Sequence, residues 1–214
     1  NANYTWSHAI STDWGRYERP GGNVASSPVN PFVQVVDKFS GETDRRHIFN
    51  ASIIAESPQF ANDAMRMVGS NWKASVLYRL QSGEWLTLDG GSDTMYDSGR
   101  ERAKQVQDNA YGNRSTRRKG YFNEDAFVRP AKGTYGNTGR NTVEGPGTWA
   151  LDMSLARTFG LTETTNLEFR AEAFNVTNSF RPLNPGSRIG RSNFGRIDNS
   201  RDPRIFQFAL KYIF

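Results

Sequence analysis

The chain has 214 residues, of which 36% are hydrophobic, 23% charged and 13% aromatic, and it contains no cysteine. The lack of cysteine excludes disulfides, thiolate metal sites and cysteine nucleophiles, and no apolar run reaches the roughly 18 residues of a membrane-spanning helix. A net charge of +5 is too mild to indicate a nucleic-acid partner. The chain begins without Met and without a signal peptide, so we expect it to be a piece of a longer protein.

A low mean hydropathy of −0.70 occurs here together with many aromatic residues and 20 glycines. Disordered chains lack the aromatic residues, and helical bundles lack the glycines. Together, these values favour a β-rich protein with long polar loops.

Apolar residues recur at every second position in six segments, as expected of strands with one apolar face. In chain order, these predicted strands cover residues 3–10, 47–56, 72–81, 148–159, from 166 onward, and 204–214. The last segment is the clearest, because one face carries Phe206, Phe208, Leu210, Tyr212 and Phe214.

The connections alternate in length. Residues 11–44, 84–146 and 178–203 form long stretches, whereas residues 58–68 and 160–165 form shorter links. Structureless loops of this length are unusual in compact soluble domains, but long loops at one end and short turns at the other are typical of outer-membrane barrels.

The alternation fits either a soluble β-sandwich, whose apolar faces bury each other, or a membrane barrel, whose apolar face meets lipid. Two features favour the barrel, in addition to the Phe that ends the last strand. Aromatic residues lie toward strand ends, namely Trp72, Trp149, Phe159, Tyr212 and Phe214. The opposite, inward face carries charge at mid-strand, namely Arg79, Glu168, Arg170 and Glu172.

Several stretches resemble, in family order, the C-terminal β-barrel of TonB-dependent outer-membrane receptors of the Oar-like type. These receptors often carry an N-terminal carboxypeptidase-regulatory-like domain. The matching stretches are NYTWSHA (3–9), DRRHIFNAS (44–52), YFNEDAF (121–127), GRNTVEGPG (139–147), FRAEAFN (169–175), NFGRI (193–197) and the terminal strand.

The resemblance implies an all-β, antiparallel transmembrane barrel of about 22 strands with a plugged lumen. Residues 1–214 would supply its C-terminal strands and long extracellular loops, without the plug domain and the N-terminal strands. It also implies a TonB box and import driven by the TonB–ExbB–ExbD complex. The terminal strand, Phe206 to Phe214, resembles the signal read by the barrel-assembly machinery.

Charged residues supply the candidate contacts. Arg100, Arg102, Arg117 and Arg118 could attract an anionic ligand, or belong to a solvated loop that touches lipopolysaccharide. The inward charges at 79, 168, 170 and 172 could touch the substrate or the plug, or form a salt-bridged wall. Asp89, Asp93 and Asp97 fit no EF-hand spacing, and we expect no metal, cofactor or catalytic residue.

The sequence therefore predicts a non-enzymatic segment of a bacterial outer-membrane transporter that imports a scarce solute by plug gating. The expected partners are outer-membrane lipid and an unidentified small solute, glycan or peptide, with no nucleic acid. The alternative is a secreted or surface β-sandwich that binds carbohydrate or acts as an adhesin.

Overall fold

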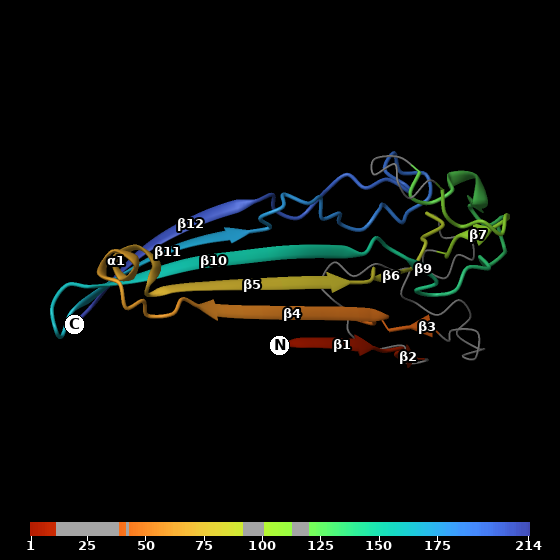
Figure 1. Ribbon diagram of the computed structural model, residues 1–214. Coiled ribbons are helices and arrows are strands. Elements are labelled where there is room, and N and C mark those ends of the chain that lie inside the picture. The colour runs from red at the N-terminus through yellow and green to blue at the C-terminus, as the bar shows by residue number, and fades with distance from the viewer. Residues whose placement is uncertain (12–38, 42, 92–100, 113–119) are drawn as a thin grey trace.

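A computed structural model describes residues 1–11, 39–41, 43–91, 101–112 and 120–214. Its main element is an antiparallel sheet whose six strands lie side by side in chain order (Figure 1). The strands are β1 (Ala2–Trp6), β4 (His47–Glu56), β5 (Trp72–Gln81), β10 (Thr148–Gly160), β11 (Asn166–Phe174) and β12 (Ile205–Ile213). All six predicted strands are thus present, and β1 and β12 form the two edges of the sheet.

The pairing register keeps the apolar rows of neighbouring strands on the same face. Tyr4 of β1 lies opposite Phe49 of β4, which lies opposite Leu80 of β5. Leu80 in turn lies opposite Trp149 of β10. Because directly paired residues of antiparallel strands project to the same side, the apolar rows merge into one continuous face. We call it the apolar face, and the opposite side the polar face.

The apolar face is uncovered in the described part of the chain. Phe208 and Leu210 of β12 are 67% and 68% exposed, and Ile53 of β4 is 65% exposed. The other sheets that the structure describes are two-stranded and pair short segments of the connections. A sandwich requires a second sheet packed on this face, so the described residues do not form the predicted alternative.

Aromatic residues mark both ends of the apolar face. At one end, the Trp149 ring lies 6.2 Å from the Tyr78 ring. At the other end, Arg157 interrupts the apolar row of β10, and its guanidinium lies 5.1 Å from the Trp72 ring and 4.7 Å from the Phe159 ring. The planar cation is accommodated on an otherwise apolar surface by these aromatic faces.

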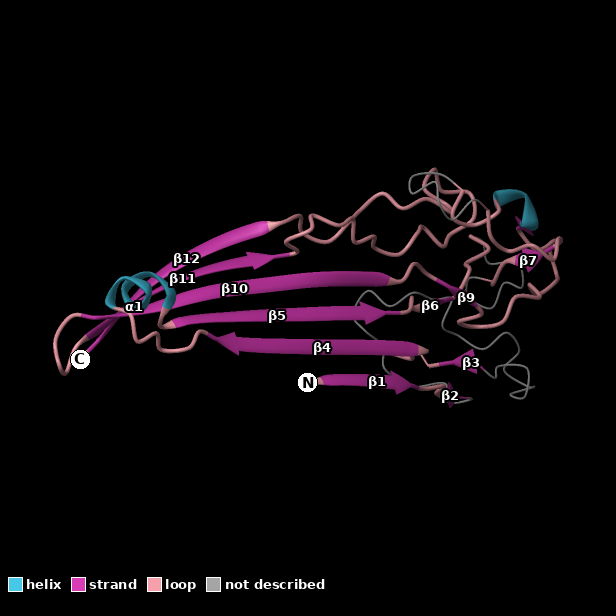
Figure 2. Ribbon diagram, in the orientation of Figure 1, coloured by secondary structure: helices cyan, strands magenta, loops and turns pink. Residues whose placement is uncertain are grey.

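Short and long connections lie at opposite ends of the sheet, as predicted (Figure 2). The link between β4 and β5 contains a helix, α1 (Asp63–Gly69), which the sequence analysis did not predict. The helix is capped by the Asn62 side chain, which accepts a hydrogen bond from the Met65 N–H at 3.2 Å. No helix in the described residues is long and apolar enough to cross a membrane.

The first strand is shorter than predicted. It ends at Trp6, and the chain turns where the Ala9 N–H donates to the Asp44 carboxylate at 3.2 Å. Ile10 therefore does not continue the row of Tyr4 and Trp6. It belongs to β2 (Ile10–Ser11), which pairs with β3 (Phe39–Ser40).

The long connections 82–147 and 175–204 are not structureless, which corrects the sequence prediction. The described parts of 82–147 contain β6 (Trp85–Leu86), β7 (Lys104–Gln105), a 3-10 helix (Glu124–Ala126), β8 (Phe127–Val128) and β9 (Val143–Glu144). The 175–204 connection forms isolated bridges, such as that between Gly186 and Phe194. Apolar residues of the two connections pack together and form the hydrophobic core of the described chain. We call the described parts of these two connections, with their common core, the loop body. Its buried members are Leu88, Ala103, Tyr121, Phe122, Ala126, Phe127, Val143, Phe194 and Ile197.

Candidate functional site

The polar face of the sheet carries a network of paired side chains. The Arg79 guanidinium lies 2.7 Å from the Asp152 carboxylate, its neighbour on β10. The Ser75 and Ser154 hydroxyls are 2.7 Å apart. These contacts join β5 to β10 on the side opposite the aromatic rows.

The predicted charges of β11 also lie on the polar face and pair with one another. Arg170 lies 2.7 Å from Glu168 and 3.8 Å from Glu172. In register, Glu168 lies opposite Lys211 of β12. The four predicted inward residues, Arg79 included, therefore share one face, and each takes part in an ion pair there. Their contact with a solute or a plug stays a prediction.

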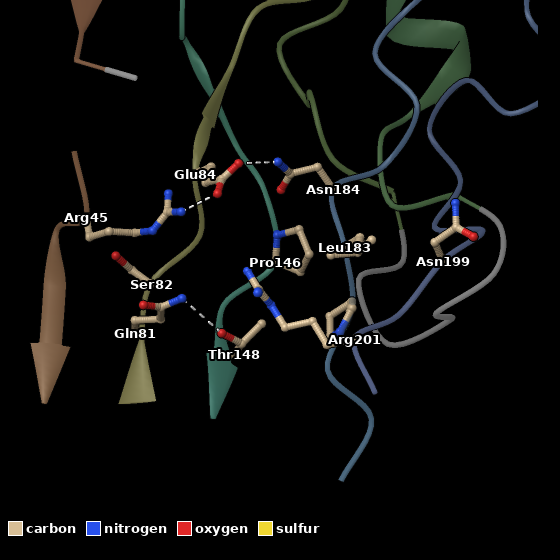
Figure 3. Close-up of a pocket in the computed structure, with 11 residues that line it drawn as sticks. Arg45, Gln81, Ser82, Glu84, Pro146, Thr148, Leu183, Asn184, Asn199 and Arg201 are labelled. Atoms are coloured by element: carbon tan, nitrogen blue, oxygen red, sulfur yellow. Dashed lines mark hydrogen bonds and ion pairs between the residues drawn. The ribbon is translucent and has the colours of Figure 1, made fainter. Parts of the chain in front are cut away.

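A cavity of about 340 Å³ opens where the polar face meets the loop body (Figure 3). Glu84, just beyond β5, is held from two sides, by the Arg45 guanidinium and by the Asn184 amide. These contacts form a clasp between the end of β5, the start of β4 and the 175–204 connection. Arg201 extends from its loop into the same cavity.

A second cavity of about 390 Å³ adjoins the first and lies further along the polar face. Gln81, Thr148 and Arg201 line both cavities, so we treat the two as one site and call it the arginine groove. The second cavity adds Arg79 from β5 and Arg181 from the 175–204 connection.

The pKa of Glu84 lies below its ordinary value. Partial burial acts in the opposite direction and raises it, but hydrogen bonds from Asn184 and Arg45 and the positive charges of Arg45 and Arg201 outweigh burial. Glu84 is therefore ionised at neutral pH, and the clasp contains a true ion pair.

The basic candidates of the sequence analysis lie elsewhere. Arg102 is 2% exposed inside the loop body, where it does not present its guanidinium to solvent. Arg100, Arg117 and Arg118 lie outside the described residues, as do Asp93 and Asp97. The Asp89 carboxylate accepts a hydrogen bond from the Gly91 N–H at 2.6 Å. Within the described ranges, no three His, Asp or Glu side chains are placed to hold a metal ion.

The arginine groove was not predicted from the sequence. Its clasp joins Glu84 to Asn184 across 100 positions of the chain, and no local pattern indicates such a contact. Pro146, which lines the cavity, lies in the GRNTVEGPG stretch, but nothing in the sequence indicated a site there. The apolar residues of the terminal strand, by contrast, lie in register on the apolar face as predicted; Ala171 of β11 lies opposite Phe208, for example.

A meandering sheet with one apolar face, one ion-paired polar face and folded loops at a single end has the architecture of a membrane β-barrel wall. The chain belongs to the family described as the outer membrane beta barrel domain, which matches residues 1–207. It is a protein of the bacterial outer membrane. No curated protein and no solved structure matches the chain.

The clasp should depend on pH. Because the folded state lowers the pKa of Glu84, its ionised form stabilises the fold above the ordinary value of 4.5 and loses this contribution as pH falls through the folded pKa. We expect hydrogen exchange of peptides covering residues 182–186, corrected for intrinsic rates, to accelerate at acidic pH. Glu84→Gln should show the fast exchange already at neutral pH. Glu163→Gln, in the exposed β10–β11 turn, is the matched control, and equal exchange in both variants would contradict the clasp.

Proposed function

We propose that the chain is part of the wall and mouth of a TonB-dependent transporter that imports a scarce solute by plug gating. The observation that carries this proposal is the combination of a two-faced meander with a folded loop body at one end only. Such an arrangement suits a barrel that meets its ligand on one side of the membrane and its energy source on the other. The stretches that resemble Oar-like receptors support TonB-dependent import among the functions of such barrels.

In this proposal the apolar face meets lipid, and its aromatic ends lie at the two interfaces. The polar face lines the lumen of a barrel of about 22 strands, with its ion pairs next to the plug or the passing solute. The loop body lies at the extracellular mouth, near lipopolysaccharide, and the β10–β11 turn and α1 lie in the periplasm. In this proposal the protein is a transporter and not an enzyme, and it acts by movement of the plug and not by catalysing a reaction.

Neighbouring positions of β10 should differ in their surroundings. Met153 projects from the apolar face and Ser154 from the polar face. The chain has no cysteine, so single cysteines at these positions can be spin-labelled selectively in it. We expect a label at Met153 to be relaxed strongly by oxygen dissolved in lipid, and a label at Ser154 to be relaxed weakly. Protection of both labels from oxygen would indicate a buried apolar face and contradict the barrel wall.

Removal of Phe214 should impair assembly while leaving the fold of this segment intact. The side chain, one residue beyond the end of β12, is 93% exposed, and its ring lies 6.1 Å from that of Tyr212. We expect its deletion from the full-length protein to lower the amount in the outer membrane several-fold, measured by fractionation. Lys211→Ala, on the polar face of β12, is the control. Unchanged assembly without Phe214 would exclude the role of the terminal strand as an assembly signal.

TonB coupling should reside upstream of this segment. We expect the coding sequence before Asn1 to specify a plug domain and a TonB box. The periplasmic domain of TonB should capture the full-length protein, and a scrambled TonB box should abolish the capture. If the upstream sequence lacks a plug and capture fails, the chain belongs to an outer-membrane barrel of another kind.

A further inference from the structure

We infer that the arginine groove binds an oxyanion group, a carboxylate or a phosphate, on the transported solute. This inference deepens the proposed function, and it rests on that proposal where it says that the bound solute is transported. Binding of the anion itself requires only the groove. Five charged residues among those described line the two cavities. Four are the guanidiniums of Arg45, Arg79, Arg181 and Arg201, and the fifth is the Glu84 carboxylate.

Two of the four guanidiniums are already neutralised. Arg45 is paired with Glu84 in the clasp, and Arg79 is paired with Asp152 at 2.7 Å. These pairs leave Arg181 and Arg201 as the source of the positive charge in the groove.

Arg181 and Arg201 have no carboxylate partner at ion-pair distance in the described part of the chain. Arg181 donates from Nη2 to the backbone carbonyl of Asp202 at 2.8 Å, which orients the side chain without cancelling its charge. Arg201 interacts with Glu84 through space only, and that carboxylate is already held by Arg45 and Asn184.

The backbone fixes these two arginines beside each other. The Arg201 N–H donates to the Arg181 carbonyl at 2.8 Å, and the Leu183 N–H donates to the Asn199 carbonyl at 3.0 Å. The connection thus doubles back on itself where it lines the groove. Figure 3 shows the Arg201 side chain reaching from this hairpin toward the strand ends that carry Gln81 and Thr148.

The chemistry of the lining matches an oxyanion on a polar solute. A guanidinium presents a planar set of donors that fits carboxylate and phosphate oxygens. Asn50, Gln81 and Thr148 add neutral amide and hydroxyl groups next to it. The volume of about 390 Å³ falls within the usual range of small-molecule sites. An acidic sugar or another small organic acid therefore fits the groove better than an uncharged or cationic solute.

The test compares glucuronate with glucose, which lacks the carboxylate, and with inorganic phosphate. Binding to the purified full-length protein in non-ionic detergent is measured by calorimetry. We expect glucuronate or phosphate to bind, more weakly at high salt, and glucose not to bind. Arg201→Gln and Arg181→Gln should each weaken binding about tenfold, as expected for loss of a charged hydrogen bond. Arg191→Gln removes the same charge from the same connection outside the groove and should leave binding unchanged.

Each outcome decides the inference. Binding of glucuronate alone identifies a carboxylate ligand, and binding of phosphate alone a phosphorylated one. No binding of either anion at up to about 10 mM, equal binding of glucose, or equal weakening by Arg191→Gln overturns it. Circular dichroism and outer-membrane fractionation show that the variants are folded. The binding assay contains no TonB, so its result does not depend on whether the protein couples to TonB.

Discussion

The structure depends on a register that keeps period-two side chains in phase across six strands. A slip of one residue in any pair would move the apolar row of that strand onto the polar face and place its charges among aromatic rings. The pairing of Arg79 with Asp152, and of Ser75 with Ser154, contributes to this constraint, because both contacts exist only in the observed register. The two faces and the polar network thus specify the same alignment.

The loop body removes a difficulty that long connections create. Buried backbone groups need hydrogen-bond partners, and apolar side chains in a loop need a core. The described parts of the connections between β5 and β10 and between β11 and β12 meet both needs against each other. The Tyr121 N–H donates to the Gly195 carbonyl at 2.8 Å, and the Phe122 ring lies 6.4 Å from the Phe194 ring. The clasp at Glu84 then joins this body to the strand ends. The arginine groove is consequently formed between two parts that each have their own packing.

The sequence predicted the sheet well and the loops poorly, for one physical reason. Phe208 and Leu210 lie on the same face because apolar and polar residues alternate within a single strand, and this alternation is a local property of the sequence. The core around Phe122 comes from segments without periodicity, and its partner Phe194 is distant in the chain. Even the helix after Asn62 carried a local capping signal, but its seven residues are too few to show a helical repeat. Arg201 lies near Glu84 only because a hairpin returns it there.

Charge on the polar face is unevenly distributed along the strands. Toward the short-turn end, Glu56 pairs with Lys73 at 3.0 Å, and Arg170 is shared between Glu168 and Glu172. At the loop-body end, Arg181 and Arg201 have no acidic partner within the described ranges, because Glu84 and Asp152 already pair with other arginines. An anion is therefore attracted most strongly at the groove and less strongly further along the face. In the proposed transporter, a solute held at the groove therefore has to leave its strongest electrostatic attraction before it moves further along the polar face.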